Sequence, residues 1–545
     1  MAVNPVKTPL TNMSFTPDVP SSALAATEYN VGYNVETDVR SIKSVLGDQY
    51  ILSQIPGNVI FVTSGFDIKN VFWFIIATSQ GKWYAMDNAG YTDITPSVGT
   101  FNGYTSSTVI TASWNGNIVF INDMINPPMY YAPNQWTPNQ IRLYDNSPDN
   151  YLWNYDVGYN NSGNIVPLYS SLTSGFIRVY NSPNVGSLLI SGNLTGVYTG
   201  NVSGTTANTI QNLPTTVRWS QNFGINSGPT TWAPTNINIA NAVEAPLRGA
   251  VVDGFSLVGN FYFFSYWDCA LLSPIAYQST STPVFGLKPL SQNRGLINEN
   301  AWAVVDTTAY GVDARDIWKF DGGTFTPLGD QRVKNYFYSN LNGNYTNQIF
   351  MTHNSAKYQI EIYYPDLNST GYCNQMISYR YDLDVWNPPR QVNNATMATE
   401  SPRWFGTQAN VSTRCVVYSS AQGNVQLVQK DTGTSFLGNT ISSLFQRNNI
   451  SFGQPYSASV QVHRMLPEIY GQGNIDITVG GSDAVANPVV YKPTVSMPIV
   501  TDNPWVQIDQ NESRVVTVQI SANSTANTWQ LSSVNWQVTV VQDTR

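Results

Sequence analysis

A short phrase that recurs along the chain constrains the fold more than any other feature of the sequence. An aromatic or apolar strand runs into a turn that ends in an aromatic-x-Pro step, or once in Ile-x-Pro. Successive steps are 42, 96, 93 and 61 residues apart, so one unit spans roughly 40 to 60 residues and the long gaps hold an insertion or an extra unit. Any single copy is also an ordinary strand-ending turn, whereas five copies indicate a repeat. The five steps are Ile94-Thr95-Pro96, Trp136-Thr137-Pro138, Trp232-Ala233-Pro234, Phe325-Thr326-Pro327 and Trp386-Asn387-Pro388.

The sequence between these steps alternates apolar and polar residues over short stretches separated by turns rich in Gly, Pro and Asn. Residues 116–121, 358–364 and 533–540 are examples. Because successive side chains of a strand face opposite sides, this alternation predicts an all-β protein. A repeat of this length with several short strands is typical of β-propeller blades, and we expect a β-propeller of about six blades. The Gly-His and Trp-Asp marks of WD40 blades are absent, and a set of unrelated sandwiches is the competing interpretation.

Three segments depart from the rhythm of the repeat. Residues 1–30, with prolines spaced through polar sequence, predict an extended N-terminal arm. Residues 31–455 are assigned to the propeller, with a β-rich loop insertion at about 135–214 that is rich in Asn, Ser, Gly and Thr. Residues 456–545 contain regular strands without an aromatic-x-Pro step, which predicts a C-terminal β-sandwich domain. Short helices are expected at 23–26 and 38–46.

The charge content of the chain restricts its function. Charged residues make up 11%, against roughly 25% in an ordinary soluble domain. The 26 basic and 34 acidic residues give a net charge of −8, which disfavours non-specific binding of duplex DNA by phosphate neutralisation.

The longest apolar run, residues 71–77, is far shorter than a membrane span, and no secretory signal is visible at the N-terminus. The three cysteines, Cys269, Cys373 and Cys415, lack metal-type spacing and are expected to be free thiols.

Residues of the kind used in catalysis are scarce. The two histidines, His353 and His463, lie near no acid pair or nucleophile motif, so we expect structural roles for both. The turn at Asp321 has some likeness to the Asp-turn of sialidases but departs from its spacing, and the simpler interpretation is that Asp321 closes a hairpin turn. We expect no catalytic, cofactor-binding or metal-binding residue. The alternative is a carbohydrate-binding or glycosidase propeller, for which four arginines could form a carboxylate-binding cluster: Arg294, Arg315, Arg332 and Arg390.

The order of several motifs is similar to that of a known family. The order runs from Val217-Arg218-Trp219-Ser220 through Trp232-Ala233-Pro234 to the apolar segments within 252–264. It continues at 316–322 and 360–365 and through Tyr379-Arg380-Tyr381 to Trp386, and it includes residues 28–47 and the strands after Gly473. Over roughly two thirds of its length the chain resembles the tail hub, or nozzle, proteins of short-tailed bacteriophages (podoviruses), also called packaged-DNA stabilisation proteins. The insertion at 135–214 departs from the shorter form of this family.

The resemblance implies a structural virion protein without enzymatic activity or cofactor. Such a protein would assemble as a homo-hexamer below the portal and adaptor, extend the DNA channel, retain the packaged viral DNA until ejection and dock tail fibre or spike proteins. It would be made in the host cytoplasm and end in the virion tail, with no membrane segment. Six copies at −8 each carry −48, and an acidic lumen would repel phosphate, so that DNA passes without sequence-specific binding. The residues that line or gate the channel, the blade count and the fibre-docking surface are left open.

Overall fold

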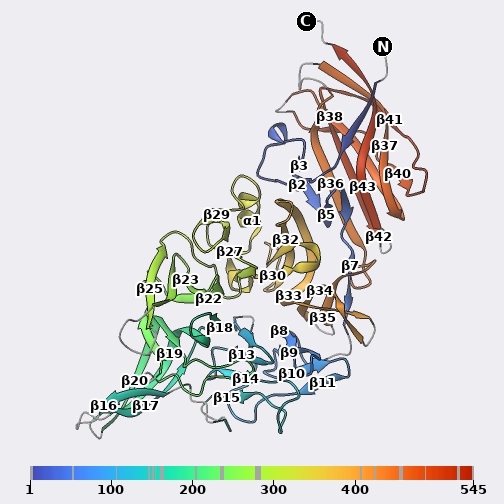
Figure 1. Cartoon of the computed structure of the whole chain (residues 1–545). Coiled ribbons are helices and arrows are strands. Elements are labelled where there is room, and N and C mark those ends of the chain that lie inside the picture. Colours follow the sequence, from blue (N-terminus) through green and yellow to red (C-terminus); the bar gives the residue numbers. More distant parts are fainter. Residues whose placement is uncertain are drawn as a thin grey trace.

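The computed structural model of the chain consists almost entirely of strands (Figure 1). Strands account for 59% of the residues and helices for 4%, so the prediction of an all-β protein is confirmed. Among the described residues, no helix has both the length and the apolar character needed to cross a membrane. The structure describes residues 4–542 apart from 52–54, 106, 145–147, 150–152, 154, 160–164, 203–204, 234–237, 276–283, 406–407, 423–424, 453–457, 485–486 and 525–527.

Six sheets follow one another along residues 59–433, and we number them sheets 1 to 6 in chain order. Sheets 1, 2, 4 and 5 each have four antiparallel strands that pair in chain order. Sheet 1 contains β8 (Val59–Phe66), β9 (Phe72–Thr78), β10 (Trp83–Asp87) and β11 (Gly90–Asp93), and sheet 2 contains β12 (Thr111–Asn115), β13 (Ile118–Asn122), β14 (Met129–Tyr131) and β15 (Arg142–Leu143). Sheet 4 contains β22 (Val251–Leu257), β23 (Asn260–Ser265), β24 (Cys269–Ile275) and β25 (Val284–Ser291), and sheet 5 contains β26 (Trp302–Val305), β27 (Thr308–Val312), β28 (Ile317–Phe320) and β29 (Phe325–Pro327).

Sheets 3 and 6 are larger variants of the same plan. Sheet 3 pairs its strands in the order β16-β17-β19-β20-β21, with β18 on β19. Sheet 6 has seven strands, because the long strand β33 pairs with β32 through its first half and with β34 through its second half. The bounds in sheet 3 are β16 (Tyr155–Tyr159), β17 (Ile165–Thr173), β18 (Phe176–Ser182), β19 (Gly186–Val202), β20 (Thr205–Trp219) and β21 (Asn241–Glu244). In sheet 6 they are β30 (Phe350–Asn354), β31 (Gln359–Tyr364), β32 (Cys373–Arg380), β33 (Val385–Phe405), β34 (Gln408–Gln422), β35 (Val425–Gly433) and β7 (Gly47–Tyr50).

The sheets pack face to face in a cycle. One hydrophobic cluster joins sheets 1 and 2, and further clusters join sheet 2 to 3, sheet 3 to 4, sheet 4 to 5 and sheet 5 to 6. A last cluster packs Trp404 and Val417 of sheet 6 against Phe74 of sheet 1. Every residue of β9 is buried, because both faces of sheet 1 are covered. The longest apolar run of the sequence is therefore a strand buried on both faces, as a continuous apolar run predicts.

The repeated phrase marks the outer hairpin of its sheet. Asp87 is the last residue of β10, and Asp321 directly follows β28, so both mark the end of the third strand of their sheet. The Asp87 carboxylate accepts a hydrogen bond from the backbone N–H of Ala89 at 2.9 Å. The Asp321 carboxylate accepts one from Gly323 at 2.9 Å and one from Thr324 at 2.7 Å. The interpretation of Asp321 as a turn-closing residue is confirmed.

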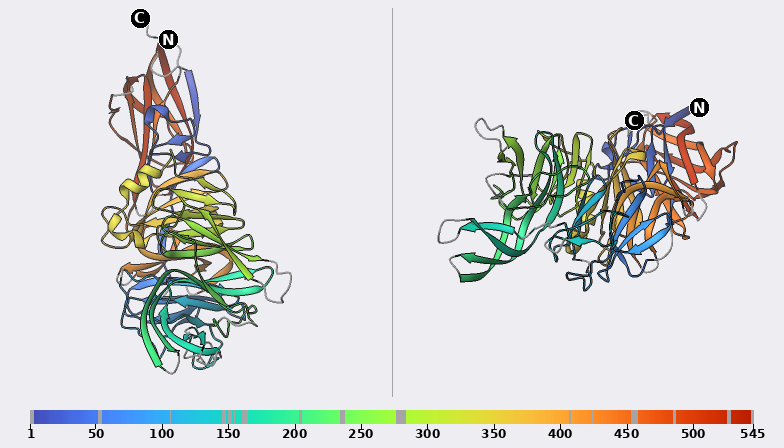
Figure 2. Two further views of the ribbon diagram at one scale, coloured as in Figure 1. Left: turned by 90° about the vertical axis from the view of Figure 1, so that its left-hand side faces the viewer. Right: turned by 60° about the horizontal axis from the view of Figure 1, so that its bottom comes forward.

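A second body lies at one end of the elongated molecule and carries both termini (Figure 2). It consists of two packed antiparallel sheets, ordered β41-β37-β43-β6-β5 with β1 on β43, and β39-β38-β42-β36-β4 with β40 on β38. Its core belongs to the same cluster that joins sheets 5 and 6. The strands are β1 (Asn4–Pro9), β4 (Val31–Tyr33), β5 (Val35–Asp38), β6 (Ser41–Ser44), β36 (Ile441–Ile450), β37 (Ala458–Gln472), β38 (Asn474–Ser482), β39 (Val490–Tyr491), β40 (Val495–Pro498), β41 (Val506–Ser513), β42 (Val515–Ser524) and β43 (Thr528–Gln542).

The N-terminal segment differs from the expected arm and boundaries. Residues 4–9 are extended, but as β1 they pair along β43, and the short strands β2 (Ser14–Phe15) and β3 (Glu28–Tyr29) pair with each other. The second body begins at β36, before residue 456, and takes four strands from the N-terminus. The alternation of strands cannot reveal this exchange, because pairing between distant strands leaves no local signal.

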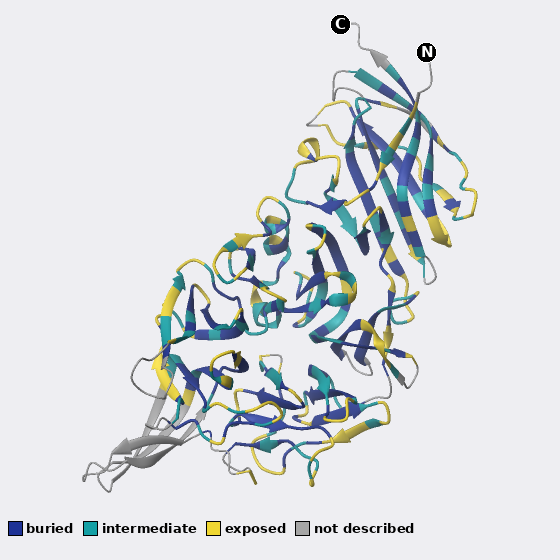
Figure 3. Cartoon of the chain, in the orientation of Figure 1, coloured by how far each residue is buried: buried dark blue, intermediate teal, exposed yellow. Residues whose placement is uncertain are grey.

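The helices also differ from the expectation. Residues 38–46 were expected to be helical, whereas β5 and β6 form a hairpin there. Residues Ser21–Ala23 form a 3-10 turn close to the expected 23–26 helix, and two further 3-10 segments occupy Gly343–Gln348 and Ser355–Lys357. The α-helix α1 (Lys334–Asn340) precedes β30. Exposed residues gather at the turns and at the edges of the sheets, and the strands in the middle of the sheets are mostly buried (Figure 3).

The expected insertion at 135–214 coincides in part with sheet 3. Residues 176–192 form β18 and the start of β19, which pack against sheets 2 and 4 and are therefore regular members of the cycle. The added length lies in β16, β17 and the distal halves of β19 and β20. Residues 145–147, 150–152, 154, 160–164 and 203–204 of the expected insertion lie outside the described residues.

Candidate functional site

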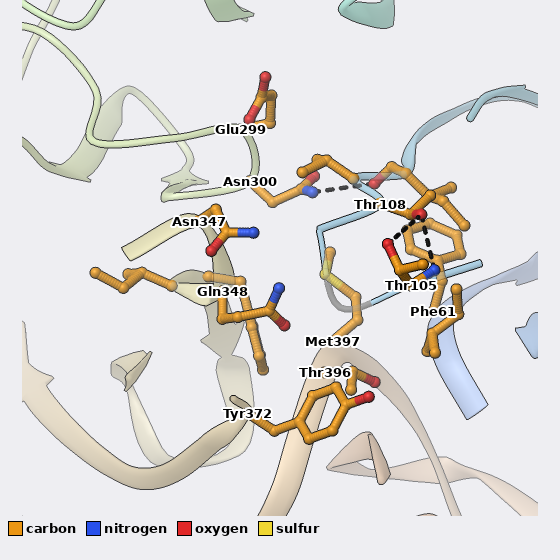
Figure 4. A pocket seen from close by; sticks show the side chains of 15 residues that line it. Phe61, Thr105, Thr108, Glu299, Asn300, Asn347, Gln348, Tyr372, Thr396 and Met397 are labelled. Atoms are coloured by element: carbon orange, nitrogen blue, oxygen red, sulfur yellow. Dashed lines mark hydrogen bonds between the residues drawn. The ribbon is translucent and has the colours of Figure 1, made fainter. Parts of the chain in front are cut away.

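A partly open cavity lies between β8 and β33 and the segments that lead into sheets 2, 5 and 6 (Figure 4). Its walls come from β8, from β33 and from the segments that precede β12, β26 and β30. It holds about 40 Å³ of space for water. Most of the polar side chains that line it are neutral, and they include Thr105, Thr108, Asn347, Gln348 and Thr396.

Glu299 is the only acid among the residues that line the cavity. Burial raises the pKa of its carboxyl to about 7, and the nearby charge of Asp253 adds to this effect while Arg178 opposes it. The residue retains part of its solvent exposure. The Glu299 carboxyl therefore holds its proton to a higher pH than an exposed glutamate does.

The buried ion pair between Arg178 and Asp253 connects sheets 2, 3, 4 and 5. The Arg178 guanidinium of β18 donates to both carboxylate oxygens of Asp253 in β22, from Nε at 2.9 Å and from an Nη at 2.6 Å. It also donates to the carbonyl of Ala112 in β12 and to the side-chain oxygen of Asn300. Trp302 Nε1 of β26 donates to Asp253 at 2.8 Å. Four of the five N–H groups of Arg178 have acceptors in this centre, so the ion pair stabilises the contacts between these sheets.

The size of the cavity limits what it can bind. One water needs about 10–15 Å³ measured this way, so the cavity holds a few water molecules. Ligand pockets for small molecules are usually about 300–1,000 Å³. A glycosidase also needs two carboxylates across the sugar ring, and this cavity has one. This cavity therefore leaves no room for a sugar ring.

The four arginines considered for a carboxylate-binding cluster do not converge. Arg294 pairs with Asp313 at 3.4 Å and with Asp316 at 3.7 Å. Arg332 pairs with Asp384 at 3.0 Å, and Arg315 lies over the Trp267 ring at 5.5 Å. Arg390 is buried in an ion network described below. Three of the arginines form ion pairs with separate carboxylates, and the exposed Arg315 lies over the Trp267 ring, so the hypothetical cluster is not formed.

The two histidines and the three cysteines all lie in strands of the sheets. His353 Nε2 lies 3.1 Å from the Tyr381 hydroxyl, and burial lowers the His353 pKa. His463 Nε2 lies 2.7 Å from the Thr539 hydroxyl. All three cysteines are free and buried, and burial raises their pKa values, to about 12 for Cys269 and about 11 for Cys415. Among the described residues, no group of three or more His, Cys, Asp and Glu is arranged to hold a metal ion.

The most extensive electrostatic feature is a group of charges between sheet 6 and the N-terminal strands, which we call the ion network. Lys357 Nζ lies 2.8 Å from Glu36 of β5 and 2.9 Å from Asp431 of β35. Arg390 of β33 pairs with Asp431 and with Asp48 of β7. The network consists of Glu36, Asp48, Lys357, Glu361, Arg390, Lys430 and Asp431.

Neighbouring cations lower the pKa values of two carboxylates of the ion network, Asp431 and Glu36, but not that of Asp48. Burial alone would raise the pKa of Asp431, but Arg390 and Lys357 lower it well below its ordinary value. Burial likewise opposes ionisation of Glu36, and Lys357 nevertheless lowers its pKa. For Asp48 burial prevails, and its pKa is raised in spite of Arg390. The network joins β5 of the second body to sheet 6, including its edge strand β7, by contacts that neither part can satisfy alone.

Sequence reasoning identified Arg390 as a possible binder of carboxylates, but not that the carboxylates belong to the protein. One signal was present in the sequence. Glu361 stands between Ile360 and Ile362, so a charge occupies a strand position whose neighbours are apolar. In a chain with few charges, such positions indicate buried pairs.

No protein-family model matches the chain, and no curated protein matches it. Among solved structures, the chain is similar to the computationally designed Ika8 protein, with 11% identity over 70% of this chain and 100% of that chain. The TM-score is 0.35, which carries no argument about fold or function.

Proposed function

We propose that the protein is a structural subunit of the tail nozzle of a short-tailed bacteriophage. In this proposal sheets 1 to 6 form a closed β-propeller, in which sheet 6 supplies two blades by dividing β33 between them. The observation that carries the proposal is the cycle of hydrophobic clusters joined to a sandwich by the ion network. Its two bodies share one hydrophobic cluster and several ion pairs, so its buried charges serve its own structure.

The proposed channel runs between subunits and not through the propeller. The axial cavity of one chain holds about 40 Å³, which cannot admit a double helix. A ring of six copies would enclose a far wider passage, bounded by acidic subunits that carry −8 each. Phosphates are repelled by such a surface, so the genome would slide without binding. Retention of DNA, attachment to the portal and adaptor, and docking of fibres or spikes are parts of the same proposal.

The test of this proposal is the assembly state of the full chain. Mass photometry and electron microscopy of the purified protein, alone and with portal-adaptor complexes, are expected to show rings of six subunits. A chain that stays monomeric at high concentration in the presence of the adaptor contradicts the proposal. A glycan-binding screen addresses the alternative, because a specific sugar ligand together with a monomeric state would favour a carbohydrate-binding propeller.

A further inference from the structure

The two ends of strand β23 carry two different exposed surfaces. β23 has six residues, about 20 Å of strand, and joins the turn at Val258 to the turn at Tyr266 and Trp267. In sheet 5, β27 separates Asp306 at one end from Arg315 at the other. Because β23 and β27 belong to neighbouring sheets of one cycle, these turns gather on opposite faces of it.

The first surface consists of hairpin turns with apolar and acidic side chains. We call Val258, Asp306, Asp321 and Tyr358 the tip surface. Val258 is 60% exposed and Tyr358 is 53% exposed, while Asp306 and Asp321 are exposed and form no ion pair among the described residues. A Cβ added to Gly322, next to Asp321, would lie 4.0 Å from the Val258 side chain, so the turns of sheets 4 and 5 adjoin.

Two residues of the tip surface have a backbone conformation that their side chains disfavour. Val258 has a φ of 47° and Tyr358 a φ of 54°. The corresponding turn in sheet 5 has Asp306 at a φ of 51°, a residue type that tolerates this region. An exposed β-branched or aromatic residue there costs stability and contributes little to the core. The side chains of Val258 and Tyr358 thus remain largely exposed, and the Tyr358 ring meets the Tyr381 ring edge to face with centroids 6.0 Å apart.

The second surface is aromatic and basic. We call Tyr266, Trp267 and Arg315 the aromatic surface. Trp267 is 44% exposed and Tyr266 is 36% exposed, and their rings meet edge to face with centroids 4.6 Å apart. The exposed Arg315 guanidinium lies 5.5 Å from the centre of the Trp267 ring and forms no ion pair with a described residue. Trp, Tyr and Arg are the residues that most often dominate binding energy at protein interfaces.

We propose that the tip surface of one copy of the chain binds the aromatic surface of the next copy. We choose a second copy of the chain as the binding partner because the tip surface and the aromatic surface are complementary in charge and in apolar character. Val258 and Tyr358 offer apolar contact to Trp267, and the unpaired carboxylates of Asp306 and Asp321 attract Arg315. Contacts between two different faces of identical subunits are heterologous, and they close into a ring when the rotation between copies allows it. This inference rests on the proposed function as a ring and identifies the contact between neighbouring subunits of that ring.

The first experiment separates docking from a structural role. Asn prefers the backbone conformation of Val258, so Val258→Asn is expected to keep or raise the melting temperature of the subunit by about 1–2 °C. The same substitution, combined with Tyr358→Asn, is expected to weaken association about tenfold or more, as measured by mass photometry. Trp267→Ser is expected to weaken association to the same degree. Val500→Ser, an exposed apolar residue of the sandwich, is the matched control and leaves assembly unchanged.

The second experiment tests the direction of the contact. A Trp267→Ser copy keeps its tip surface, and a Val258→Asn/Tyr358→Asn copy keeps its aromatic surface. An equimolar mixture is therefore expected to form pairs but no rings. This inference is overturned if every variant still forms rings as the wild type does. It is also overturned if the two variants do not pair in the mixture. In both cases the proposal that the wild-type chain forms a ring is unaffected. A wild-type chain without rings overturns both the proposed function and this contact.

Discussion

Lys357 Nζ lies 2.8 Å from the Glu36 carboxylate, although 321 positions separate the two residues in the chain. Glu36 belongs to β5 in the sandwich, and Lys357 belongs to the turn between β30 and β31 in sheet 6. Lys357 also reaches Asp431, which binds Arg390. The two bodies of the molecule are thus joined by buried charges as well as by an apolar contact.

Replacement of Arg390 by Met is expected to destabilise the protein by about 3–5 kcal/mol, because it leaves the fully buried Asp48 without its cation. Chemical denaturation followed by tryptophan fluorescence measures this loss. Lys82→Met breaks the exposed pair with Asp93 and is the control, with an expected change below about 1 kcal/mol. Equal effects of the two substitutions would show that the ion network does not stabilise the junction.

Glu299 makes stability depend on pH near neutrality. Its folded pKa of about 7 lies above its ordinary value of 4.5, so the folded state binds the proton more tightly. The stabilisation is complete below pH 4.5 and is lost as the pH rises towards 7. Glu299→Gln is expected to remove this dependence and to be more stable than wild type at pH 8 by about 2 kcal/mol. Parallel unfolding curves of the two proteins from pH 5 to pH 8 are the measurement, and a constant difference would contradict the assignment.

Glu36 contributes a pH dependence of the opposite sign. Its pKa is lowered in the folded state, so its stabilisation is present above about pH 4.5 and is lost as the pH falls through the folded pKa. Glu36→Gln is expected to lower stability at pH 7 and to reduce the further loss on acidification. Acid titrations of both proteins, followed by circular dichroism, check this sign. A variant that matched wild type at pH 7 would exclude a contribution from Glu36.

The three thiols are expected to be unreactive in the native protein. Burial raises the pKa of Cys269 to about 12 and that of Cys415 to about 11, and it also raises the pKa of Cys373. The thiolate is the reactive form, so at pH 8 Ellman's reagent should label the folded chain far more slowly than the chain in denaturant. Rapid labelling of even one native thiol would contradict its burial.

Removal of residues 1–50 is expected to prevent folding of both bodies. This deletion removes β4, β5 and β6 from the sandwich and β7 from sheet 6. It also removes Glu36 and Asp48 from the ion network. Removal of residues 1–9 takes only β1 from the edge of one sheet and is the milder control. Soluble yield and near-ultraviolet circular dichroism compare the two, and a folded product of the longer deletion would contradict the pairing of β7 with β35.

Local features were predictable wherever the signal lies within a few residues. The alternation at 116–121 and 358–364 predicted strands, and strands β13 and β31 occupy these segments. The turn at Asp321 could be predicted because its carboxylate accepts hydrogen bonds from the backbone N–H groups of Gly323 and Thr324, two and three residues further along the chain. The hairpin at 38–46 was missed, since β5 and β6 are stabilised by strand β43 far along the chain.

The sequence by itself determined an all-β chain of repeated hairpins with few charges, because strand periodicity and turn chemistry act over short distances. Only the tertiary structure decided that the N-terminus supplies strands to both bodies, that Arg390 binds carboxylates of its own chain, and that Glu299 faces a cavity of about 40 Å³. These outcomes depend on contacts between residues hundreds of positions apart. Burial then sets the charge state of each group, and burial is a property of the packed sheets.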